Sequence, residues 1–398
     1  MFVRRVAATA LIGLAVSACA SSPNASGSPA SPTAPTSKPT PSATVSPSVA
    51  PTRSATPSAN PGSGQFNVYA ETLSGRVAPG LANLSPRVYV PDEGSGDVVV
   101  IDPRTFRIVG RFKVGLSPEH ITPDWDLSKL YVNNMSSSGL TVIDTRTQRP
   151  VRTISVPYPY NLYFTEDGSK AIVVDDIMGT ADNAHNGLYF FDRKTWKFLK
   201  FVQVPYPGVD HLDFSADGTF LLASCETSGT VVKVDVRSMT LSGKARVGGL
   251  PLDVRLSPNG KVFYVANQGL AGVNVVDART LKVTGFIHTG TGAHGLGFSR
   301  DTKTLYVTNR IAGTISVVDV ATNKVTATWT VGGSPDMIAF SPDGTQMWVS
   351  NRYHGTVEVI DPRTGRIEHR IATGIGPHGL AFWPVPGRYS LGHNGNMR

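Results

Sequence analysis

The sequence predicts an all-β fold, a seven-bladed β-propeller of four-stranded antiparallel blades whose ring is closed by joining the N- and C-terminal strands. The first observation is an aspartate that ends a β-branched run and recurs at intervals of 42, 48, 43, 42, 42 and 42 residues. The second is that each interval holds four short apolar runs bounded by Gly, Pro, Asn or Asp. The repeated aspartates are Asp102, Asp144, Asp192, Asp235, Asp277, Asp319 and Asp361.

Residues 303–344 contain the clearest single unit. Its runs LYVTN, TISVVD, KVTATWTV and DMIAF alternate or are rich in β-branched residues, which is typical of strands. The segment SPDG then supplies Pro and Gly for a tight turn. Each repeated aspartate opens a turn such as DVAT, where its side chain would cap backbone amides. We therefore interpret these seven carboxylates as structural and not catalytic.

The two ends of the repeat region supply the third observation. The runs RVYVPD, DVVVID and RIVGRFKV make only three strands of a blade, whereas HGLAFW at residues 378–383 is an inner strand without a blade. We predict that HGLAFW completes the first blade, which removes open sheet edges. The alternative inner strand is VAPGLANLSP, which precedes the first repeat. The propeller would span residues 87–384, between an extension at 65–86 and a polar tail at 385–398 whose course the sequence does not predict.

The first 64 residues predict export and a lipid anchor. Residues 1–18 hold two arginines and the run AATALIGLAVSA, which is too short to span a bilayer and is typical of a signal sequence. The run ends in VSAC, which resembles a bacterial lipobox, so Cys19 would be the acylated first residue of the mature protein. An ordinary secretory signal with a coincidental cysteine is the alternative. Residues 19–64, rich in Ala, Pro, Ser and Thr, would be a disordered tether that anchors the propeller to the outer face of the cytoplasmic membrane or cell envelope.

Composition and motifs argue against several functions. The net charge is +8, and the four basic residues of the first 64 leave only +4 for the remainder, so no basic cluster indicates a nucleic-acid partner. Cys225 is the only cysteine besides Cys19, so we expect no internal disulfide. The motifs GxSxG, HExxH and paired CxxC are missing, which removes the recognisable signals of serine hydrolases, zincins and zinc ribbons. We expect a monomer.

Histidines recur at one position of the repeat, the residue that opens each inner strand. The seven opening residues are His120, Asn161, His211, Asp253, His294, Asp336 and His378. Inner strands line the channel of a propeller, so the four histidines would gather at one channel mouth. Neutral imidazoles with carboxylates nearby suit Zn or Cu, and these histidines are the predicted metal ligands. The alternative is structural, because a His or Asp here could bond to the backbone of the adjacent blade and be copied with the repeat.

The links between second and third strands should lie on the same face, because successive strands of a blade are antiparallel. With three of the opening residues they give the predicted contacts for a small polar ligand, which are Asn161, Asp253, Asp336, Arg310, Arg352 and His354. Further polar candidates in these links are Glu93, Asp175, Asp176, His185, Glu226 and Gln268. His185 belongs to DIMGTADNAHNG, the insertion that lengthens one interval to 48 residues.

The recurring segments YVTN at residues 306–309, YVNN, YVAN and WVSN, together with the SPDG turns, resemble the YVTN or YncE-like family of β-propellers. The resemblance covers residues 87–383 and implies the propeller fold. It selects no single function, because related propellers include surface-layer proteins, lactonases, streptogramin lyases and periplasmic zinc chaperones. The His-bearing inner strands look most like the metal-binding members.

Three functional hypotheses follow. The first is a tethered binding protein whose channel mouth accepts a metal ion or a small polar ligand. The second is an enzyme, a lyase or lactonase, with a channel histidine as general base and Arg310 or Arg352 holding an anionic group. The third is a scaffold without a site that presents its faces to other envelope proteins. We favour a binding protein over an enzyme.

Overall fold

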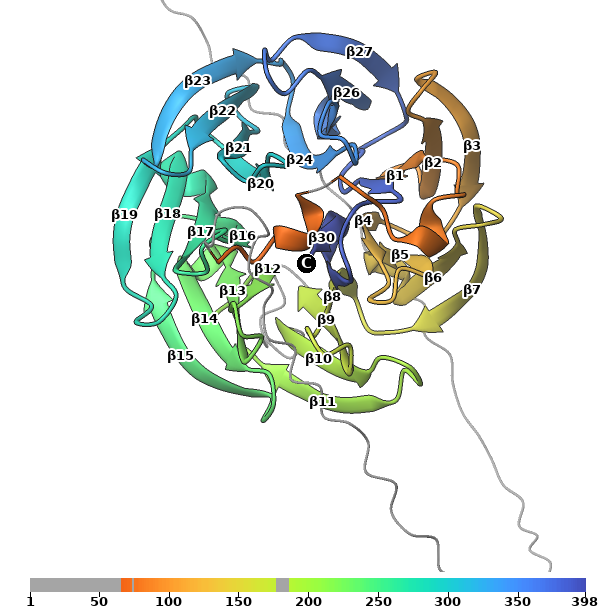
Figure 1. Ribbon diagram of the computed structural model, residues 1–398. Helices are drawn as coiled ribbons and strands as arrows, with labels where there is room; N and C mark the ends of the chain where they lie inside the picture. The colour runs from red at the N-terminus through yellow and green to blue at the C-terminus, as the bar shows by residue number, and fades with distance from the viewer. Residues whose placement is uncertain (1–65, 74, 177–185) are drawn as a thin grey trace, which may run out of the picture. The chain divides into compact units, whose positions relative to one another are not determined.

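The computed structural model describes residues 66–73, 75–176 and 186–398 (Figure 1). The predicted signal sequence, Cys19, the tether and His185 lie outside the described residues. Seven antiparallel sheets surround a central channel, which confirms the predicted seven-bladed propeller. Within the described ranges there is no α-helix, and hence no helix long and apolar enough to cross a lipid bilayer.

Each blade contains four strands that run from the channel outward. The blade that closes the ring consists of β28 (Ala381–Trp383), β1 (Arg87–Asp92), β2 (Asp97–Asp102) and β3 (Arg107–Lys113). The next two blades consist of β4 (Pro118–Pro123), β5 (Lys129–Asn134), β6 (Gly139–Asp144) and β7 (Arg149–Ser155), and of β8 (Pro159–Phe164), β9 (Lys170–Asp176), β10 (Asn186–Asp192) and β11 (Phe198–Gln203). The fourth and fifth consist of β12 (Val209–Phe214), β13 (Phe220–Cys225), β14 (Thr230–Asp235) and β15 (Thr240–Arg246), and of β16 (Pro251–Leu256), β17 (Val262–Asn267), β18 (Gly272–Asp277) and β19 (Val283–His288). The last two consist of β20 (Ala293–Phe298), β21 (Thr304–Asn309), β22 (Thr314–Asp319) and β23 (Lys324–Thr330), and of β24 (Pro335–Phe340), β25 (Met347–Asn351), β26 (Thr356–Ile360) and β27 (Ile367–Ala372).

Burial follows the position of a strand in its blade. Inner strands such as β4, β8, β12 and β24 are buried at all six residues, because neighbouring blades cover both faces and the channel is filled. Outer strands such as β3 and β7 are exposed at most positions. The core is therefore a set of layers between blades and not one central cluster.

The asparagine of the YVTN segment explains why this motif repeats. Asn309 Oδ1 accepts a hydrogen bond from the Gly290 N–H at 3.0 Å, and its Nδ2 donates to Ser316 Oγ at 3.0 Å. The side chain thus ties the loop that enters a blade to the second and third strands. The same bond to a loop N–H is made by Asn134, Asn267 and Asn351.

Short 3₁₀ turns follow the second strands of four blades, after an asparagine in three of them and after Cys225 in the fourth, and carry polar side chains to one channel mouth. These turns are η3 (Met135–Ser137), η4 (Glu226–Ser228), η5 (Gln268–Leu270) and η6 (Arg352–His354). Each ends at a residue in the left-handed region, as at Gly229 with φ of 63° and Gly355 with φ of 65°. This conformation turns the chain sharply into the third strand.

The seven repeated aspartates cap turns, as expected. Asp319 Oδ1 accepts the Thr322 N–H at 2.8 Å and the Thr322 hydroxyl at 2.7 Å. The equivalent aspartates that accept a backbone N–H are Asp102, Asp144, Asp192, Asp235, Asp277 and Asp361. Their carboxylates lie at the outer turns, away from the channel.

Ring closure also occurs as predicted. Strand β28 pairs with β1 in antiparallel register, with Tyr89 opposite Ala381 and Arg87 opposite Trp383. The alternative segment VAPGLANLSP is not a strand and contains the 3₁₀ turn η2 (Pro79–Leu81). The strand is shorter than the run HGLAFW, because the chain before Ala381 makes only one isolated bridge, between Pro377 and Asp92.

The C-terminal tail folds back into the channel. It contains β29 (Ser390–Gly392), η7 (His393–Gly395) and β30 (Asn396–Met397), and β30 with the chain end lies at the middle of the ring in Figure 1. Strand β29 pairs with β8, so that blade becomes a six-stranded sheet. The N-terminal turn η1 (Ala70–Thr72) follows Tyr69, whose hydroxyl donates to Leu256 O at 2.7 Å.

Candidate metal and ligand site in the channel

A cavity of about 970 Å³ opens at the channel mouth that carries the links between second and third strands. Inner strands contribute Glu119, Asp210 and His294 to its lining. The links contribute Glu93, Glu226, Gln268, Arg310, Arg352 and His354. The cavity is therefore lined by both signs of charge and is large enough for a small polar molecule.

A first group of imidazoles, which we call the histidine triad, comprises His120, His211 and His393. One nitrogen of each ring lies within 4.8 Å of one nitrogen of each other ring, and all three side chains are buried. The ring centroids of His120 and His211 are 5.2 Å apart, and those of His211 and His393 are 4.7 Å apart. Two rings come from the inner strands β4 and β12, and the third comes from the tail.

Hydrogen bonds at Nδ1 fix the tautomers of two rings in the triad. Asn394 Oδ1, which can only accept, lies 3.2 Å from His120 Nδ1, and Asp210 accepts from His211 Nδ1. Both rings therefore carry their proton on Nδ1 and have a lone pair on Nε2. Among the described residues, neither Nε2 atom has a hydrogen-bond partner, although both are buried. A side-chain oxygen on one nitrogen and a free lone pair on the other is the usual arrangement of metal-binding histidines.

The third ring, His393, accepts a hydrogen bond at Nδ1, where the other two rings donate one. Asn161 Nδ2 donates to His393 Nδ1 at 2.9 Å, and the amide cannot be reversed because Asn161 Oδ1 accepts the Leu162 N–H at 2.9 Å. The neutral ring thus carries its proton on Nε2, which lies 3.7 Å from Asp253 Oδ1. For His393 to bind a metal through Nε2, its proton must move to Nδ1.

Burial keeps the triad uncharged. It lowers the pKa of His120 to about 3, although the hydrogen bond that His120 donates to Asn394 opposes this shift. Burial, reinforced by neighbouring histidines, also lowers the pKa values of His211 and His393 well below the usual value. All three rings are therefore neutral at physiological pH, the form in which a histidine binds a metal.

A second group lies beside the first and comprises His294, Asp336 and His378. Asp336 Oδ1 is 2.7 Å from His294 Nδ1, and Asp336 Oδ2 is 3.9 Å from His378 Nε2. Arg310 and Arg352 approach the same Oδ2 at 3.7 and 4.0 Å. Although burial alone would raise it, Arg310 and the histidines hold the pKa of Asp336 well below its usual value. Two guanidinium groups already offset this carboxylate, which makes the second group a poorer cation site than the triad.

His378 connects the two groups, since its ring centroid is 4.5 Å from that of His120. Its Nδ1 contacts Glu119, a carboxyl that sequence reasoning missed. Burial raises the pKa of Glu119 to about 8, against the opposing effect of Arg352. Arg352 also contacts Glu93 directly, so both arginine-facing acids lie on one side of the cavity.

The structure brings the four predicted histidines together with Asp336, Arg310 and Arg352, while His354 lies exposed at the rim. Asn161 and Asp253 are buried and do not line the cavity. Asp253 Oδ2 accepts the Leu296 N–H of the next blade at 2.9 Å, which is the structural alternative considered for these positions. Asp175 is buried in β9, and neither it nor Asp253 lines the cavity.

His393 and Asn394 were missed because they belong to no repeat. Their segment, GHNGNM, contains one histidine among small polar residues and has no strand pattern. Only the folded chain places it between the inner strands.

Comparison with known proteins identifies the family. The model of the YNCE-like beta-propeller matches residues 71–385, which is most of the chain. The chain belongs to the YNCE-like β-propeller family. The comparison with curated proteins finds no match.

Several solved propellers are similar to this YNCE-like protein. A functionally unknown protein from Desulfotomaculum acetoxidans DSM 771 has 17% identity and a TM-score of 0.64, covering 75% of this chain and 99% of that one. Hydrazine synthase of Kuenenia stuttgartiensis has 19% identity and a TM-score of 0.59, covering 72% and 98%. Apo AztD from Citrobacter koseri has 13% identity and a TM-score of 0.55, covering 78% and 99%. At these identities the likeness is one of fold, and function must be argued from the site.

Proposed function

We propose that this protein is a metal-binding propeller that holds a zinc or copper ion at the histidine triad. The observation that carries the proposal is the convergence of three buried, neutral imidazoles, two of which have unpartnered Nε2 lone pairs among the described residues. Burying a ring nitrogen without a partner costs free energy, and a coordinated metal ion would recover it. Imidazole donors suit Zn and Cu better than Mg or Ca.

The triad resembles three-ligand metal sites, in which the fourth position is taken by water or an exogenous ligand. The cavity above it has His294 and Glu119 in its lining and could admit such a ligand. A small polar molecule in the cavity is therefore compatible with a metal below. The positions of Asp210 and Asn394 support the triad as second-sphere partners.

Titration of the purified, chelator-treated chain with Zn²⁺ and Cu²⁺ tests the proposal. Structural zinc sites with about four ligands bind the metal with a free energy of about 10 to 16 kcal/mol, which is about 3 kcal/mol for each ligand. Losing one imidazole should therefore weaken binding about 100-fold. We expect this loss in His120→Ala, His211→Ala and His393→Ala, and no change in His288→Ala, whose ring is exposed on an outer strand. Absence of stoichiometric binding, or binding lost in His294→Ala but retained in the triad variants, would refute it.

A second candidate function is an enzyme that uses His294 as a general base. The short His294–Asp336 distance and the place of His294 and Arg310 in the cavity lining favour it. Burial lowers the pKa of His294, so a neutral base would be present at pH 7. A screen of lactones and of substrates for lyases tests it, with His294→Ala expected to abolish any turnover found.

We further propose that the propeller works outside the cytoplasmic membrane, held by an acylated Cys19 and the tether of residues 19–64. The support is the signal-like run and the VSAC tetrapeptide. Palmitate labelling in cells should disappear in Cys19→Ala. Equal labelling of both proteins would rule out the anchor.

A further inference from the structure

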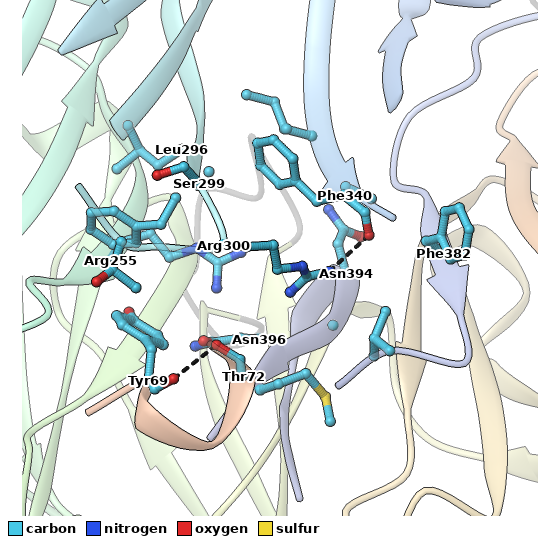
Figure 2. Close-up of a pocket in the computed structure, with 18 residues that line it drawn as sticks. Tyr69, Thr72, Arg255, Leu296, Ser299, Arg300, Phe340, Phe382, Asn394 and Asn396 are labelled. Carbon is cyan, nitrogen blue, oxygen red and sulfur yellow. Dashed lines mark hydrogen bonds between the residues drawn. The ribbon is translucent and has the colours of Figure 1, made fainter. Parts of the chain in front are cut away.

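A second, smaller pocket lies at the opposite end of the channel, where the inner strands end. Its volume is about 90 Å³, enough for a small ion or a few water molecules. Figure 2 shows the side chains of Arg255 and Arg300 reaching into this space beside Tyr69 and Asn394. No part of the proposed metal function requires this pocket.

The pocket exists because three inner strands carry side chains of very different size at equivalent positions. Arg255 in β16, Gly297 in β20 and Ala339 in β24 pair with equivalent positions of their second strands, opposite Tyr264, Tyr306 and Trp348. The two small residues leave room next to the long arginine. The tail closes the space from the channel side with Asn394 and Asn396.

Arg300 departs from the repeat in a way that the turn does not need. It occupies the second position of the turn after an inner strand, where the equivalent residues are Glu166, Ala216, Pro258 and Pro342. Its guanidinium donates to Ser341 O at 3.0 Å and to Phe340 O at 2.8 Å. Among the described residues no carboxylate lies within ion-pair distance of it. Burial lowers the pKa of Arg300 to about 10, with the Asp343 carboxylate opposing the shift from beyond ion-pair distance.

Two other donors that line the pocket, on Arg255 and Asn394, also lack an acceptor. Arg255 Nε is buried without a hydrogen-bond partner among the described residues, and its nearest carboxylate oxygen, Asp253 Oδ2, is 3.9 Å away. Asn394 Nδ2 is likewise buried and unpartnered, because Asn394 Oδ1 is directed at His120. Two unpaired donors and a guanidinium without a carboxylate at ion-pair distance, all in one pocket, call for an anionic acceptor.

We propose that this pocket binds a small oxyanion, of the phosphate, sulfate or carboxylate class, between Arg255, Arg300 and Asn394. Guanidinium groups present paired N–H donors that match such oxygens. The amide of Asn394 supplies a further donor from the tail. The size of the pocket admits the free ion or a terminal anionic group, and not a large molecule.

Calorimetric titration of the full chain with sodium phosphate, sulfate and acetate, against sodium chloride, tests the proposal. We expect one anion to bind at one site. Arg300→Pro should weaken this binding about tenfold or more, since a charge-assisted hydrogen bond contributes about 1.5 to 3 kcal/mol. Pro258 and Pro342 occupy the same turn position, so this variant should fold. The conservative Arg300→Lys should retain part of the affinity.

Arg366→Gln is the matched control, because it removes an exposed guanidinium that lines neither pocket, and its anion binding should equal that of the wild type. Arg310→Gln removes a guanidinium from the large cavity at the other mouth and tells the two sites apart. The proposal is overturned if none of the three anions binds up to about 20 mM, where even weak sites are detected. It is equally overturned if Arg300→Pro binds as the wild type does, or if binding is lost in Arg310→Gln and kept in Arg300→Pro. The anion that binds most tightly identifies the class.

Discussion

Asp92 offers a test of the electrostatics at the ring closure. This residue ends β1, is fully buried, and bridges to Pro377 of the closing segment. Thr373 donates to its Oδ1 at 2.9 Å, whereas Arg111 lies 3.6 Å from its Oδ2, which has no hydrogen-bond partner among the described residues. Burial raises the pKa of Asp92 to about 7, with Thr373 opposing the shift. The folded protein therefore keeps this carboxyl neutral in a range where the unfolded chain ionises it.

The sign of the effect follows from linkage. A raised folded-state pKa gives stability that is complete below the unfolded pKa of 3.8 and is lost as the pH rises to about 7. About 1.4 kcal/mol per pH unit over this interval sets a ceiling of about 4 kcal/mol. Because Arg111 is partly exposed to solvent and can adjust, we expect about 1 to 3 kcal/mol. In Asp92→Asn the neutral amide keeps the shape and an oxygen for Thr373, so this loss should not occur.

Urea unfolding of metal-free protein, followed by tryptophan fluorescence at pH 5, 6, 7 and 8, measures the difference. Asp92→Asn should gain stability relative to the wild type as the pH rises, with the gain levelling off near pH 8. Asp144→Asn is the control, because its carboxylate caps an exposed turn of the next blade and stays ionised over this pH range, so it should show no pH-dependent gain. A difference between Asp92→Asn and the wild type that is independent of pH, or a variant that is less stable at pH 8, would show that Asp92 is buried as the charged partner of Arg111.

Two further predictions concern the triad and the repeat. Asn161→Asp places a carboxylate at His393 Nδ1, moves the ring proton to Nδ1 and frees Nε2, so zinc affinity should rise about tenfold in competition with a chelating indicator. Asn161→Leu should give no gain, and equal affinities for both variants would argue against His393 as a ligand. Asp319→Ala removes the acceptor for Thr322 and should cost about 1 kcal/mol of stability in thermal unfolding, as a lost cap does. Its metal affinity should equal that of the wild type, and a large loss would contradict the structural interpretation of the repeated aspartates.

The propeller could be predicted from the sequence because each repeat consists of short local patterns. Alternating runs, turn residues and capping aspartates such as Asp319 act within one blade and can be counted along the chain. Ring closure was predictable for the same reason, since HGLAFW has the pattern of an inner strand and the first blade lacked one. The register of the repeat then placed His120, His211, His294 and His378 at one end of the channel.

What the sequence could not predict depends on non-repeating segments. The tail has no strand pattern, and its entry into the channel depends on contacts such as the Arg398–Asp213 ion pair at 3.3 Å, between residues 185 positions apart. Glu119 was missed because it precedes the residue that marks the register. Asp253 was predicted to contact a ligand, but it accepts a hydrogen bond from a backbone N–H of the next blade. Only the distances in the folded chain distinguish these two roles.

The C-terminal tail determines how a ligand could reach the central channel. Because His393, Asn394 and Asn396 lie on the channel axis, the large cavity and the small arginine-lined pocket are two separate cavities at opposite mouths. A ligand of the large cavity would therefore enter and leave through the same channel mouth. A protein that exchanged such a ligand would meet it at the mouth that carries the 3₁₀ turns.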